Sequence, residues 1–398
     1  MKESSLSRRR FVSFLAVGGL TSLSGCSGLI NPCRRADPPK DLMKHPMVQE
    51  AWRGVDPAQM WDVHVHLTGT GDSGKGLWLH PSSQQRHHPM RYLATKFFMN
   101  GGCVDPKQVD QSYVRRLHAL MEAFPSGAKA MLLAFDYAYN ESRQLQQEKS
   151  HFYTSNSYAA EMAQRYPERF EWIASIHPWR SDAIPALERA AANGAKAVKW
   201  LPPSQGIDPA NPRCVPFYKA LARLELPLLC HTGEEKAVIS HSPEDWGEPK
   251  RLKLALKHDV KVILAHCATT GHDQNGHPYF DQFIQMMERP AYEGLLFGDI
   301  SAVVLRNRTK LEIQTLLERT EWHQRMLYGS DYPLPGIVPL ISLSRLQGFG
   351  FLQASQIEPL RLLREHNPML FSFVLTRVLR HEGTGFSDQA FHTRKLFP

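Results

Sequence analysis

The sequence predicts an α/β fold, a (β/α)8 TIM barrel with an insertion in the first βα loop. Eight short apolar stretches alternate with amphipathic segments over about 320 residues, which is the pattern of parallel strands joined by helices. Such a barrel takes about 250 residues before insertions, so the 398-residue chain can contain one. Polar residues end several of the apolar stretches, where the strands of such a barrel carry functional groups.

The predicted strands are runs of four to eight residues rich in Val, Ile, Leu and aromatic side chains, which is typical of buried parallel strands. Between them, apolar residues recur every three or four positions, which predicts helices, and Gly194 is placed to end one of them. The strands are expected at 61–67, 129–135, 171–177, 197–201, 228–232, 260–267, 295–301 and 326–331. The helices are expected at 112–123, 157–165, 183–193, 215–224, 249–258, 280–288, 310–318 and 359–379.

The first βα unit is longer than the others. His66 and Asp136, at the ends of the first two predicted strands, are 70 residues apart, about twice the length of an ordinary unit. We therefore predict an insertion at 68–110. A loop at this position lies over the catalytic face of a barrel, so it could cover a substrate, and a partner-binding or mobile excursion is the alternative.

The first 25 residues resemble a twin-arginine lipoprotein signal peptide. Arginines 8–10 precede an apolar run at 11–23, and Leu23-Ser24-Gly25-Cys26 has the form of a lipobox. An apolar run of about a dozen residues is too short to cross a bilayer, which takes about 20. The prediction is export by the twin-arginine route and a lipid anchor on Cys26, at the periplasmic or extracellular face of the membrane. Residues 26–50, with four prolines, are predicted to be a tether to the barrel at 51–398.

The charge of the chain limits the kinds of binding partner that are expected. The formal net charge is +8, and cleavage of the signal would remove four basic residues and Glu3, which leaves +5. No basic stripe is interleaved with aromatic residues, so a small-molecule substrate is expected and nucleic acid is not.

The sequence has no C-x-x-C pair. Cys33 could form a disulfide with Cys103 or Cys214, whereas Cys230 and Cys267 are expected to be buried.

Two histidines lie two residues apart in the first predicted strand. Side chains alternate along a strand, so His64 and His66 should share one face while Val63 and Val65 share the other. Two imidazoles from one strand form half of a divalent metal site, for which Zn²⁺ is the commonest occupant. The pair alone also fits a surface coincidence or a satisfied polar pair, so further ligands must come from elsewhere.

Other predicted strands also end in polar residues. Lys199 lies in the fourth strand, and His231, His266 and Asp331 end the fifth, sixth and eighth. Their separations of 32, 35 and 65 residues correspond to one, one and two βα units. His177 and Trp200 are candidate substrate-binding residues, with packing as the alternative. Packing or capping is also expected for the remaining polar strand ends, Asp136, Tyr137, Glu234 and Asp299.

Taken together, the H-x-H, A-H-C and G-S-D-Y-P motifs resemble the amidohydrolase superfamily, and within it the amidohydrolase-related (amidohydrolase 2) subgroup of single-domain barrels. The resemblance runs from about residue 61 to residue 377. It implies that His64, His66, His231 and Asp331 hold a divalent metal. It also implies that His266 lies beside the metal as a proton-transfer or oxyanion-stabilising group.

The implied chemistry is hydrolysis. A Zn²⁺ with an open position lowers the pKa of bound water to about 7. Asp331 can accept a proton from that water and pass it to the leaving group, and His266 can polarise the carbonyl under attack. We therefore expect a metal-dependent hydrolase that acts on a carbonyl or ester-like C–O or C–N bond of a small molecule.

Several alternatives stay open at this point. Lys199 could bind a substrate carboxylate or an internal acid, with one metal present, or be carbamylated and bridge two. The same subgroup includes non-oxidative decarboxylases and hydratases, so a lyase is the main alternative. A phosphodiesterase is a third possibility, but phosphodiesterase barrels carry a glutamate in the fourth strand, where this chain has Lys199. A non-catalytic binding lipoprotein is disfavoured because the ligand set is intact. Substrate and oligomeric state are not predicted.

Overall fold

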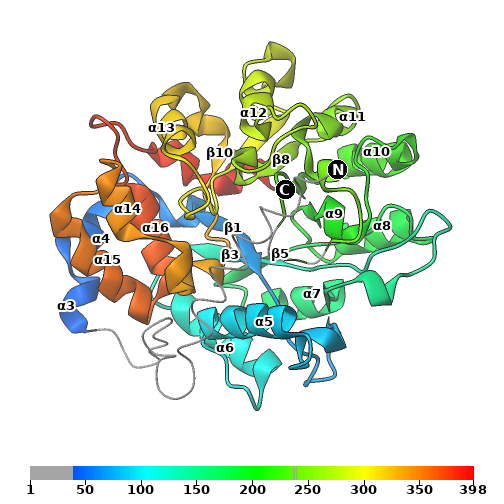
Figure 1. Ribbon diagram of the computed structural model, residues 1–398, viewed down its shortest axis with the longest axis horizontal. Coiled ribbons are helices and arrows are strands. Elements are labelled where there is room, and N and C mark those ends of the chain that lie inside the picture. Colours follow the sequence, from blue (N-terminus) through cyan, green and yellow to red (C-terminus); the bar gives the residue numbers. More distant parts are fainter. Residues whose placement is uncertain (1–38, 236–237, 239) are drawn as a thin grey trace.

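Eight parallel strands surround a common axis in the computed structural model, which describes residues 39–398 except 236, 237 and 239 (Figure 1). Each strand is followed by at least one helix before the next, apart from short excursions described below. The strands of the barrel are β1 (Trp61–His66), β3 (Lys129–Leu133), β5 (Phe170–Ile173), β6 (Val198–Trp200), β7 (Leu228–His231), β8 (Val262–Ala265), β9 (Leu296–Asp299) and β10 (Met326–Leu327).

The strands close into a ring. β1, β3 and β5 form one parallel run, and β6 to β10 form a second. A parallel bridge between Ala174 and Val198 joins β5 to β6, and another between Val65 and Tyr332 joins the segment after β10 to β1. The amide of Asp331 also donates to the carbonyl of His64 at 2.9 Å. The predicted (β/α)8 barrel is therefore confirmed.

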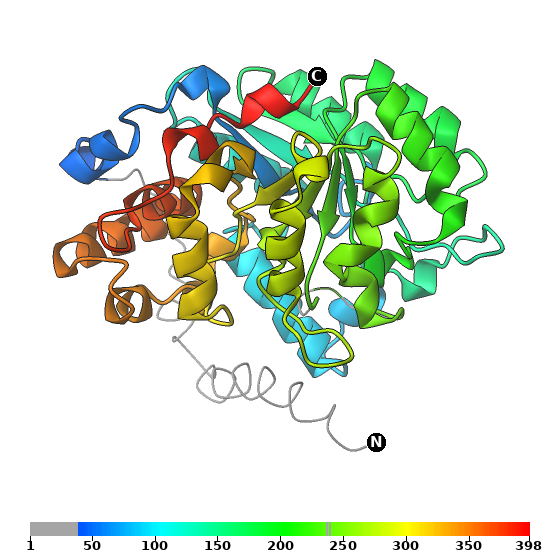
Figure 2. The ribbon, with the colours of Figure 1, turned by 90° about the horizontal axis from the view of Figure 1, so that it is seen from above.

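The helices cover the outside of the ring (Figures 1 and 2). The predicted helix at 359–379 is in fact two, because Asn367, which precedes Pro368, is extended (φ −141°, ψ 91°), as a residue before proline prefers. The side chain of Asn367 then caps the second helix by accepting from the amide of Leu370. The helices of the barrel layer are α6 (Val109–Met121), α7 (Asn156–Arg165), α8 (Ala183–Ala192), α10 (Val215–Arg223), α11 (Lys253–Leu256), α12 (Tyr279–Met287), α13 (Lys310–Glu318), α14 (Leu343–Gly348), α15 (Ala354–His366) and α16 (Pro368–Val378).

Two apolar clusters form the core. The larger one lies between the ring and the helices, and the smaller one collects residues contributed by or adjoining all eight strands, so it fills the inside of the barrel. Leu396, in the last turn η13 (Thr393–Leu396), belongs to the inner cluster, and the hydroxyl of Thr393 donates to the carbonyl of Trp61 at 2.6 Å. The C-terminal segment therefore closes the end of the barrel where β1 begins (Figure 2).

A bulge in β1 changes the predicted alternation of side chains. The pairing register with β3 shifts between Asp62 and Val65. As a result Val63 lies in the inner cluster and Val65 in the outer one, so the prediction that they share a face is wrong. His64 and His66 nevertheless line the same cavity.

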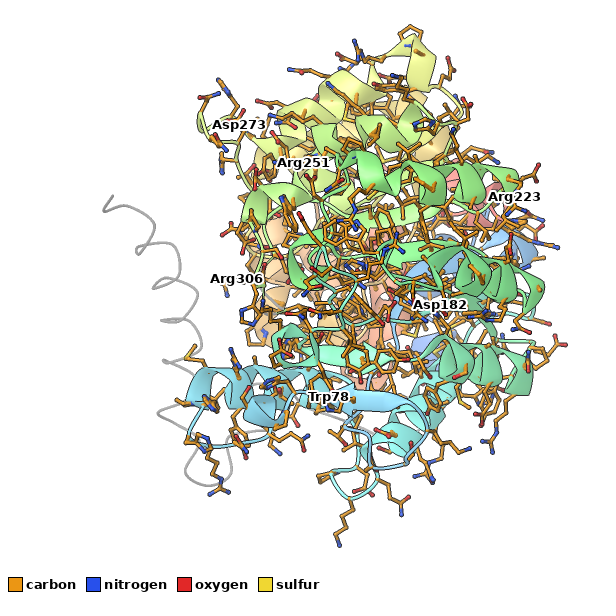
Figure 3. All side chains as sticks on the ribbon, turned by 90° about the vertical axis from the view of Figure 1, so that its right-hand side faces the viewer. Trp78, Asp182, Arg223, Arg251, Asp273 and Arg306 are labelled. Carbon is orange, nitrogen blue, oxygen red and sulfur yellow. The ribbon has the colours of Figure 1, made fainter. Side chains whose placement is uncertain are left out.

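The insertion at 68–110 has secondary structure that periodicity did not predict. β2 (Leu77–Leu79) pairs antiparallel with β4 (Phe152–Thr154) from the following unit, and α5 (Pro89–Gly101) follows it. Figure 3 shows this segment, labelled at Trp78, along one edge of the barrel. The insertion is thus built against the barrel rather than standing free of it.

The described part of the predicted tether is also packed. Residues 39–50 contribute helices α3 (Lys40–Met43) and α4 (Pro46–Ala51), and Val48 is buried in the outer core. Arg377 of α16 donates to the carbonyl of Ala51 at 2.8 Å. The tether prediction is therefore wrong for these residues. Residues 1–38, with the predicted signal peptide, the lipidation site Cys26, and Cys33, lie outside the described residues.

In the part of the chain that the structure describes, no helix is both long enough and apolar enough to span a membrane. Cys103 is disulfide-bonded, whereas Cys214, Cys230 and Cys267 are free and buried. The alternative pairing of Cys33 with Cys214 is therefore excluded, and the predicted burial of Cys230 and Cys267 is confirmed.

The role of the C-terminal plug can be tested by shortening Leu396. Leu396→Ala should lower the free energy of unfolding by about 2–3 kcal/mol, because it leaves a cavity in the inner cluster. Leu311→Ala is the control, since Leu311 is 68% exposed on α13 and its truncation should cost under about 0.5 kcal/mol. Urea denaturation measures both. Equal losses would show that the plug contributes nothing to the barrel.

Candidate metal centre

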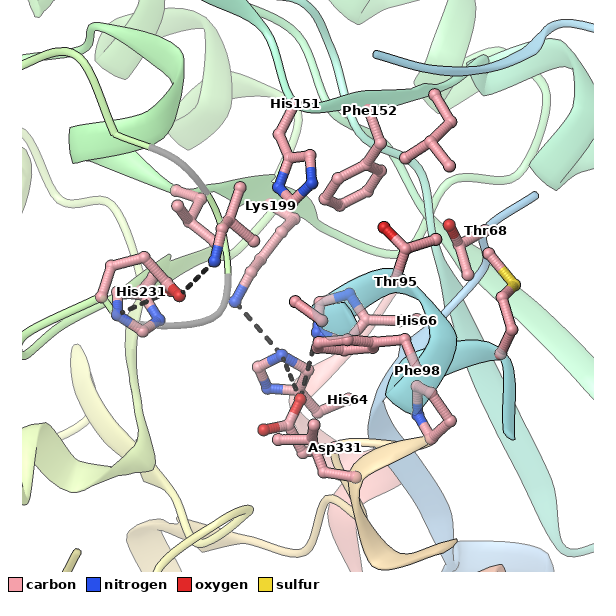
Figure 4. A pocket seen from close by; sticks show the side chains of 18 of the residues that line it. His64, His66, Thr68, Thr95, Phe98, His151, Phe152, Lys199, His231 and Asp331 are labelled. Atoms are coloured by element: carbon pink, nitrogen blue, oxygen red, sulfur yellow. Dashed lines mark hydrogen bonds and ion pairs between the residues drawn. The ribbon is translucent and has the colours of Figure 1, made fainter. Parts of the chain in front are cut away.

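A cavity opens where the barrel strands end, opposite the C-terminal plug (Figure 4). All of the predicted metal ligands line it, and so do the predicted proton-transfer residue and Lys199. The rest of the wall is mostly apolar and comes largely from the insertion and from β4. The polar residues of the wall are His64, His66, Thr68, Thr95, His151, Lys199, His231, Glu235, His266 and Asp331.

His64, His66 and Asp331 form the centre of the site. One ligand atom from each lies within 4.8 Å of the others. Nε2 of His66 is 3.1 Å from Oδ1 of Asp331, and Nε2 of His64 is 3.6 Å from the same oxygen. These contacts converge in Figure 4. The first and eighth strand units therefore supply three candidate ligands to one point.

His231, the fourth predicted ligand, lies in the wall of the same cavity but outside this group. Its ring is 5.2 Å from the ring of His266. Its Nε2 is buried and makes no hydrogen bond, and Oε2 of Glu235 lies 3.4 Å from it. A buried imidazole nitrogen without a hydrogen bond is costly unless it serves another purpose. Imidazole and carboxylate donors are the set that Zn²⁺ and similar divalent cations prefer, so the residues fit such a cation.

The surroundings shift the pKa values of three candidate ligands toward the protonation states that a metal requires. Burial lowers the pKa of His64 and drives that of His231 well below the ordinary value, and the nearby charge of Lys199 acts in the same direction. Burial alone would raise the pKa of Asp331, but His64 and the hydrogen bond from His66 hold it well below its usual range. Neutral imidazoles beside an ionised carboxylate are ready to coordinate a cation.

Asp299 orients His64. Its Oδ2 lies 2.5 Å from Nδ1 of His64, and Ser301 donates to the same carboxylate oxygen at 2.9 Å. A carboxylate accepts, so Nδ1 carries the proton and Nε2 is left as the free nitrogen toward Asp331. His64, His266 and Asp299 also form a compact group, but the contact of Asp299 with Nδ1 gives it an orienting role. The expectation that Asp299 only packs or caps is therefore wrong.

His266 is oriented in the same way. Its Nδ1 lies 3.1 Å from the carbonyl of Ser301 and 2.9 Å from the Ser301 hydroxyl. A carbonyl can only accept, so Nδ1 carries the proton and Nε2 is the basic nitrogen of the neutral ring. Burial drives the pKa of His266 well below its ordinary value. This arrangement favours His266 as a proton acceptor rather than as a hydrogen-bond donor to an oxyanion.

The backbone around the site is strained and closely packed. Asp331 and His266 are both in the left-handed region (φ 57° and 59°), which is strained for a residue with a side chain. A Cβ at Gly329 would lie 2.8 Å from Cβ of His64, so only glycine fits there. Oδ1 of Asp62 accepts from the amides of His64 (3.2 Å) and Ser330 (2.8 Å), and burial raises the pKa of Asp62 to about 7.

Lys199 lies at the site, and the other two predicted substrate contacts do not. Lys199 is 1% exposed, its Nζ is 3.4 Å from Nε2 of His64, and burial lowers its pKa. His177 donates to the carbonyl of Gln205 and accepts from an amide, and the indole of Trp200 donates to a backbone carbonyl. Neither lines the cavity. The substrate-binding predictions for His177 and Trp200 are therefore wrong, since both side chains are used in packing.

Sequence reasoning missed two titratable residues of the cavity. Glu235 follows the end of β7, and its Oε1 accepts from the amide of Val238 at 2.8 Å. His151 precedes β4, lies 3.1 Å from the hydroxyl of Ser83, and has its pKa lowered to about 4 by burial. Neither lies in a motif, and only the pairing of β4 with β2 brings His151 to the wall.

Comparison with known proteins identifies the family of this chain. A profile of the amidohydrolase family (Amidohydro_2) matches residues 61–336. The chain belongs to this family. Its members are metal-dependent enzymes that include hydrolases and decarboxylases, and the predicted relationship is confirmed. No curated protein sequence gives a significant match.

Solved structures that resemble this amidohydrolase are distant in sequence. One is an uncharacterized TIM-barrel protein from Bordetella bronchiseptica (17% identity, TM-score 0.45, covering 77% of this chain and 98% of that one). A second, from Pseudomonas putida, is named provisionally as a 2-pyrone-4,6-dicarboxylic acid hydrolase (14%, 0.45, 79% and 97%). A third is 5-carboxyvanillate decarboxylase from Sphingomonas paucimobilis (12%, 0.45, 70% and 90%).

The orienting role of Asp299 predicts a loss of metal affinity. Asp299→Asn should weaken binding of a divalent cation by about 10–100-fold, because His64 loses the carboxylate that fixes its tautomer. Asp281→Asn, at an exposed position of α12, is the control and should leave affinity unchanged. Competition with a chromogenic chelator measures both. Wild-type affinity in Asp299→Asn would contradict the assignment.

The buried His177 should contribute to the loss of folding stability at acidic pH. Burial lowers its pKa to about 3, whereas an unfolded histidine titrates near pH 6.5, so its contribution is present above about pH 6.5 and is lost as the pH falls toward 3. His177→Asn keeps an acceptor for the Trp179 amide but removes this titration. Between pH 6 and 4.5 the variant should lose stability less steeply than wild type, by up to about 1.4 kcal/mol per pH unit. Parallel slopes in urea denaturation would refute this.

Proposed function

We propose that this amidohydrolase is a metal-dependent hydrolase of a carbonyl or ester-like C–O or C–N bond in a small molecule. The observation that supports it is the convergence of His64, His66 and Asp331, with His231 in the same wall, at the open end of a closed barrel. One divalent cation, which we take to be Zn²⁺, would supply a Lewis acid and lower the pKa of a water molecule there. Protein groups would carry out the remaining steps.

Asp331 and His266 are the proposed proton carriers. The surrounding groups hold the carboxylate of Asp331 in its ionised state, so it can accept a proton from an attacking water. His266 presents a basic Nε2 while its Nδ1–H is held by Ser301. A proton taken up at either group can be returned to the leaving oxygen or nitrogen. The apolar wall around them would exclude other water.

Lys199 is the proposed contact for a negatively charged part of the substrate. Its ammonium lies in the cavity 3.4 Å from Nε2 of His64, so a carboxylate or oxyanion beside the metal position would be within its reach. Carbamylation of Lys199 would instead create a bridge between two metals. Because Asp299 of the second compact group is engaged by His64, the described residues favour a single cation.

A lyase is the second candidate, and the position of Lys199 favours it. A cation and an ammonium side by side could hold the carboxylate of a substrate that loses CO₂. The two reactions differ in their products. We would incubate the zinc-loaded protein with esters, lactones and aromatic carboxylates in H₂¹⁸O. Cleavage of the substrate with ¹⁸O incorporation and without CO₂ release supports the hydrolase, and CO₂ release without ¹⁸O incorporation into the organic product supports a decarboxylating lyase. Full metal occupancy without turnover would support a binding lipoprotein.

We also propose that the protein is exported by the twin-arginine route and anchored through a lipid on Cys26. The support is the order of the paired arginines, the short apolar run and the lipobox. Substitution of both Arg8 and Arg9 by lysine should retain the protein in the cytoplasm, as cell fractionation would show. Unchanged export would exclude the route. A small molecule is the proposed partner, and nucleic acid is not.

The role of His266 gives a direct kinetic prediction. His266→Gln should lower kcat by about 10²–10⁴-fold, since the basic nitrogen is lost, while the metal content stays unchanged. His277→Gln, at a side chain 71% exposed on the surface, is the control. Turnover and elemental analysis are measured on the same samples. Wild-type kcat in His266→Gln would remove this residue from the mechanism.

A further inference from the structure

Helix α5 of the insertion is apolar but does not belong to the core. Of its 13 residues, all of which the structure describes, only Gly101 is buried. None of its Met, Leu, Phe or Tyr side chains is part of either core cluster or packs against one. These side chains are half-buried, apart from the exposed Met90, so burying them further elsewhere would be favourable.

The two sides of α5 face different surroundings. Ala94, Thr95, Phe98 and Met99 line the metal cavity, and Figure 4 labels Thr95 and Phe98 there. The helical period places Met90, Leu93 and Phe97, spaced by three and four residues, in a row directed away from those residues. Met90 is 38% exposed, and Leu93 and Phe97 are partly exposed. We refer to this row as the outer face of α5.

The charged residues close to α5 in the sequence are basic. Between Asp72 and Asp105 there is no acidic residue. Of the four basic residues in this segment, Lys75 is paired with Glu161 at 3.2 Å and Arg91 donates to the hydroxyl of Ser82 at 2.6 Å. Lys96 is exposed on α5, and Arg86 is exposed just before the helix. Apolar side chains flanked by basic ones are the pattern of a helix that lies on an anionic lipid surface. The basic residues of this stretch are Lys75, Arg86, Arg91 and Lys96.

Cys103 follows α5 directly and is disulfide-bonded, whereas Cys214, Cys230 and Cys267 are free. Its partner lies outside the described residues, where the sequence has Cys26 and Cys33. A lipid on Cys26 would occupy that sulfur and leave Cys33. Six residues lie between Cys26 and Cys33, so the two are about 25 Å apart at most. The lipid would then be held close to the end of α5.

We propose that the outer face of α5 docks on the anionic bilayer in which the lipid on Cys26 is inserted. The apolar row enters the interface, and the flanking Arg and Lys side chains lie at the level of the headgroups. Because the other side of the same helix lines the metal cavity, the cavity opens next to the membrane. This inference rests on the lipid anchor proposed above and not on which reaction the metal site performs.

The test uses the acylated protein purified from membranes and reconstituted into vesicles of phosphatidylethanolamine and phosphatidylglycerol. A bimane label is placed at Met90→Cys or Phe97→Cys, with Leu311→Cys on α13 as the matched control, since Leu311 is also an exposed apolar helix residue. Spin-labelled lipids should quench the label on α5 about threefold or more strongly than the label at 311. Hydrogen exchange of the wild-type α5 amides should slow in the same vesicles, which avoids any effect of the substitutions.

Several outcomes would overturn the proposal. These are equal quenching at the two positions, stronger quenching at 311, or protection of α5 that depends on protein concentration without vesicles, which would indicate a second copy instead. Recovery of the protein without a lipid would do the same. The quenching is read without substrate and the metal content separately, so a failure here is distinguishable from a failure of the proposed hydrolase.

Discussion

The closure of the strand ring between its first and last members is the constraint on which the rest of the site depends. Asp62 accepts the amide of Ser330 across 268 residues of sequence, and the amide of Asp331 donates to the carbonyl of His64. These bonds hold the His-x-His strand beside the Gly-Ser-Asp segment. Without them His64 and Asp331 would belong to opposite ends of an open sheet, and no cation could contact both.

Placing the functional side chains in the cavity costs free energy, which the surrounding structure must offset. Two of the functional residues, His266 and Asp331, adopt left-handed backbone angles, and several imidazoles are buried with their pKa values lowered. Asp299 and Ser301 compensate by hydrogen bonding the imidazole nitrogens that face away from the cavity. The carboxylate of Asp299 and the carbonyl of Ser301 thereby determine which nitrogen of His64 and of His266 remains basic. The nitrogen that faces away from the cavity is paired in both rings, and the other is left for chemistry.

The fold and the positions of the candidate ligands could be predicted from the sequence because both follow from local pattern and regular spacing. The predictions that failed concern the orientation of side chains or contacts between residues that are far apart in the sequence. His177 and Trp200 are near strand ends but turn away from the cavity, and a strand-end position alone does not show which face a side chain takes. Val63 was misplaced because a bulge interrupts alternation. The partnership of Asp299 with His64 spans 235 residues, so no local motif reveals it.

Anomalous X-ray diffraction at the zinc edge, from crystals of the zinc-loaded protein, would show directly whether these residues bind a cation. We expect one strong peak in the barrel cavity, within bonding distance of His64, His66 and Asp331 and with His231 turned toward it. A peak between His64 Nδ1 and Asp299, or a zinc bound only on the outer surface, would contradict this expectation.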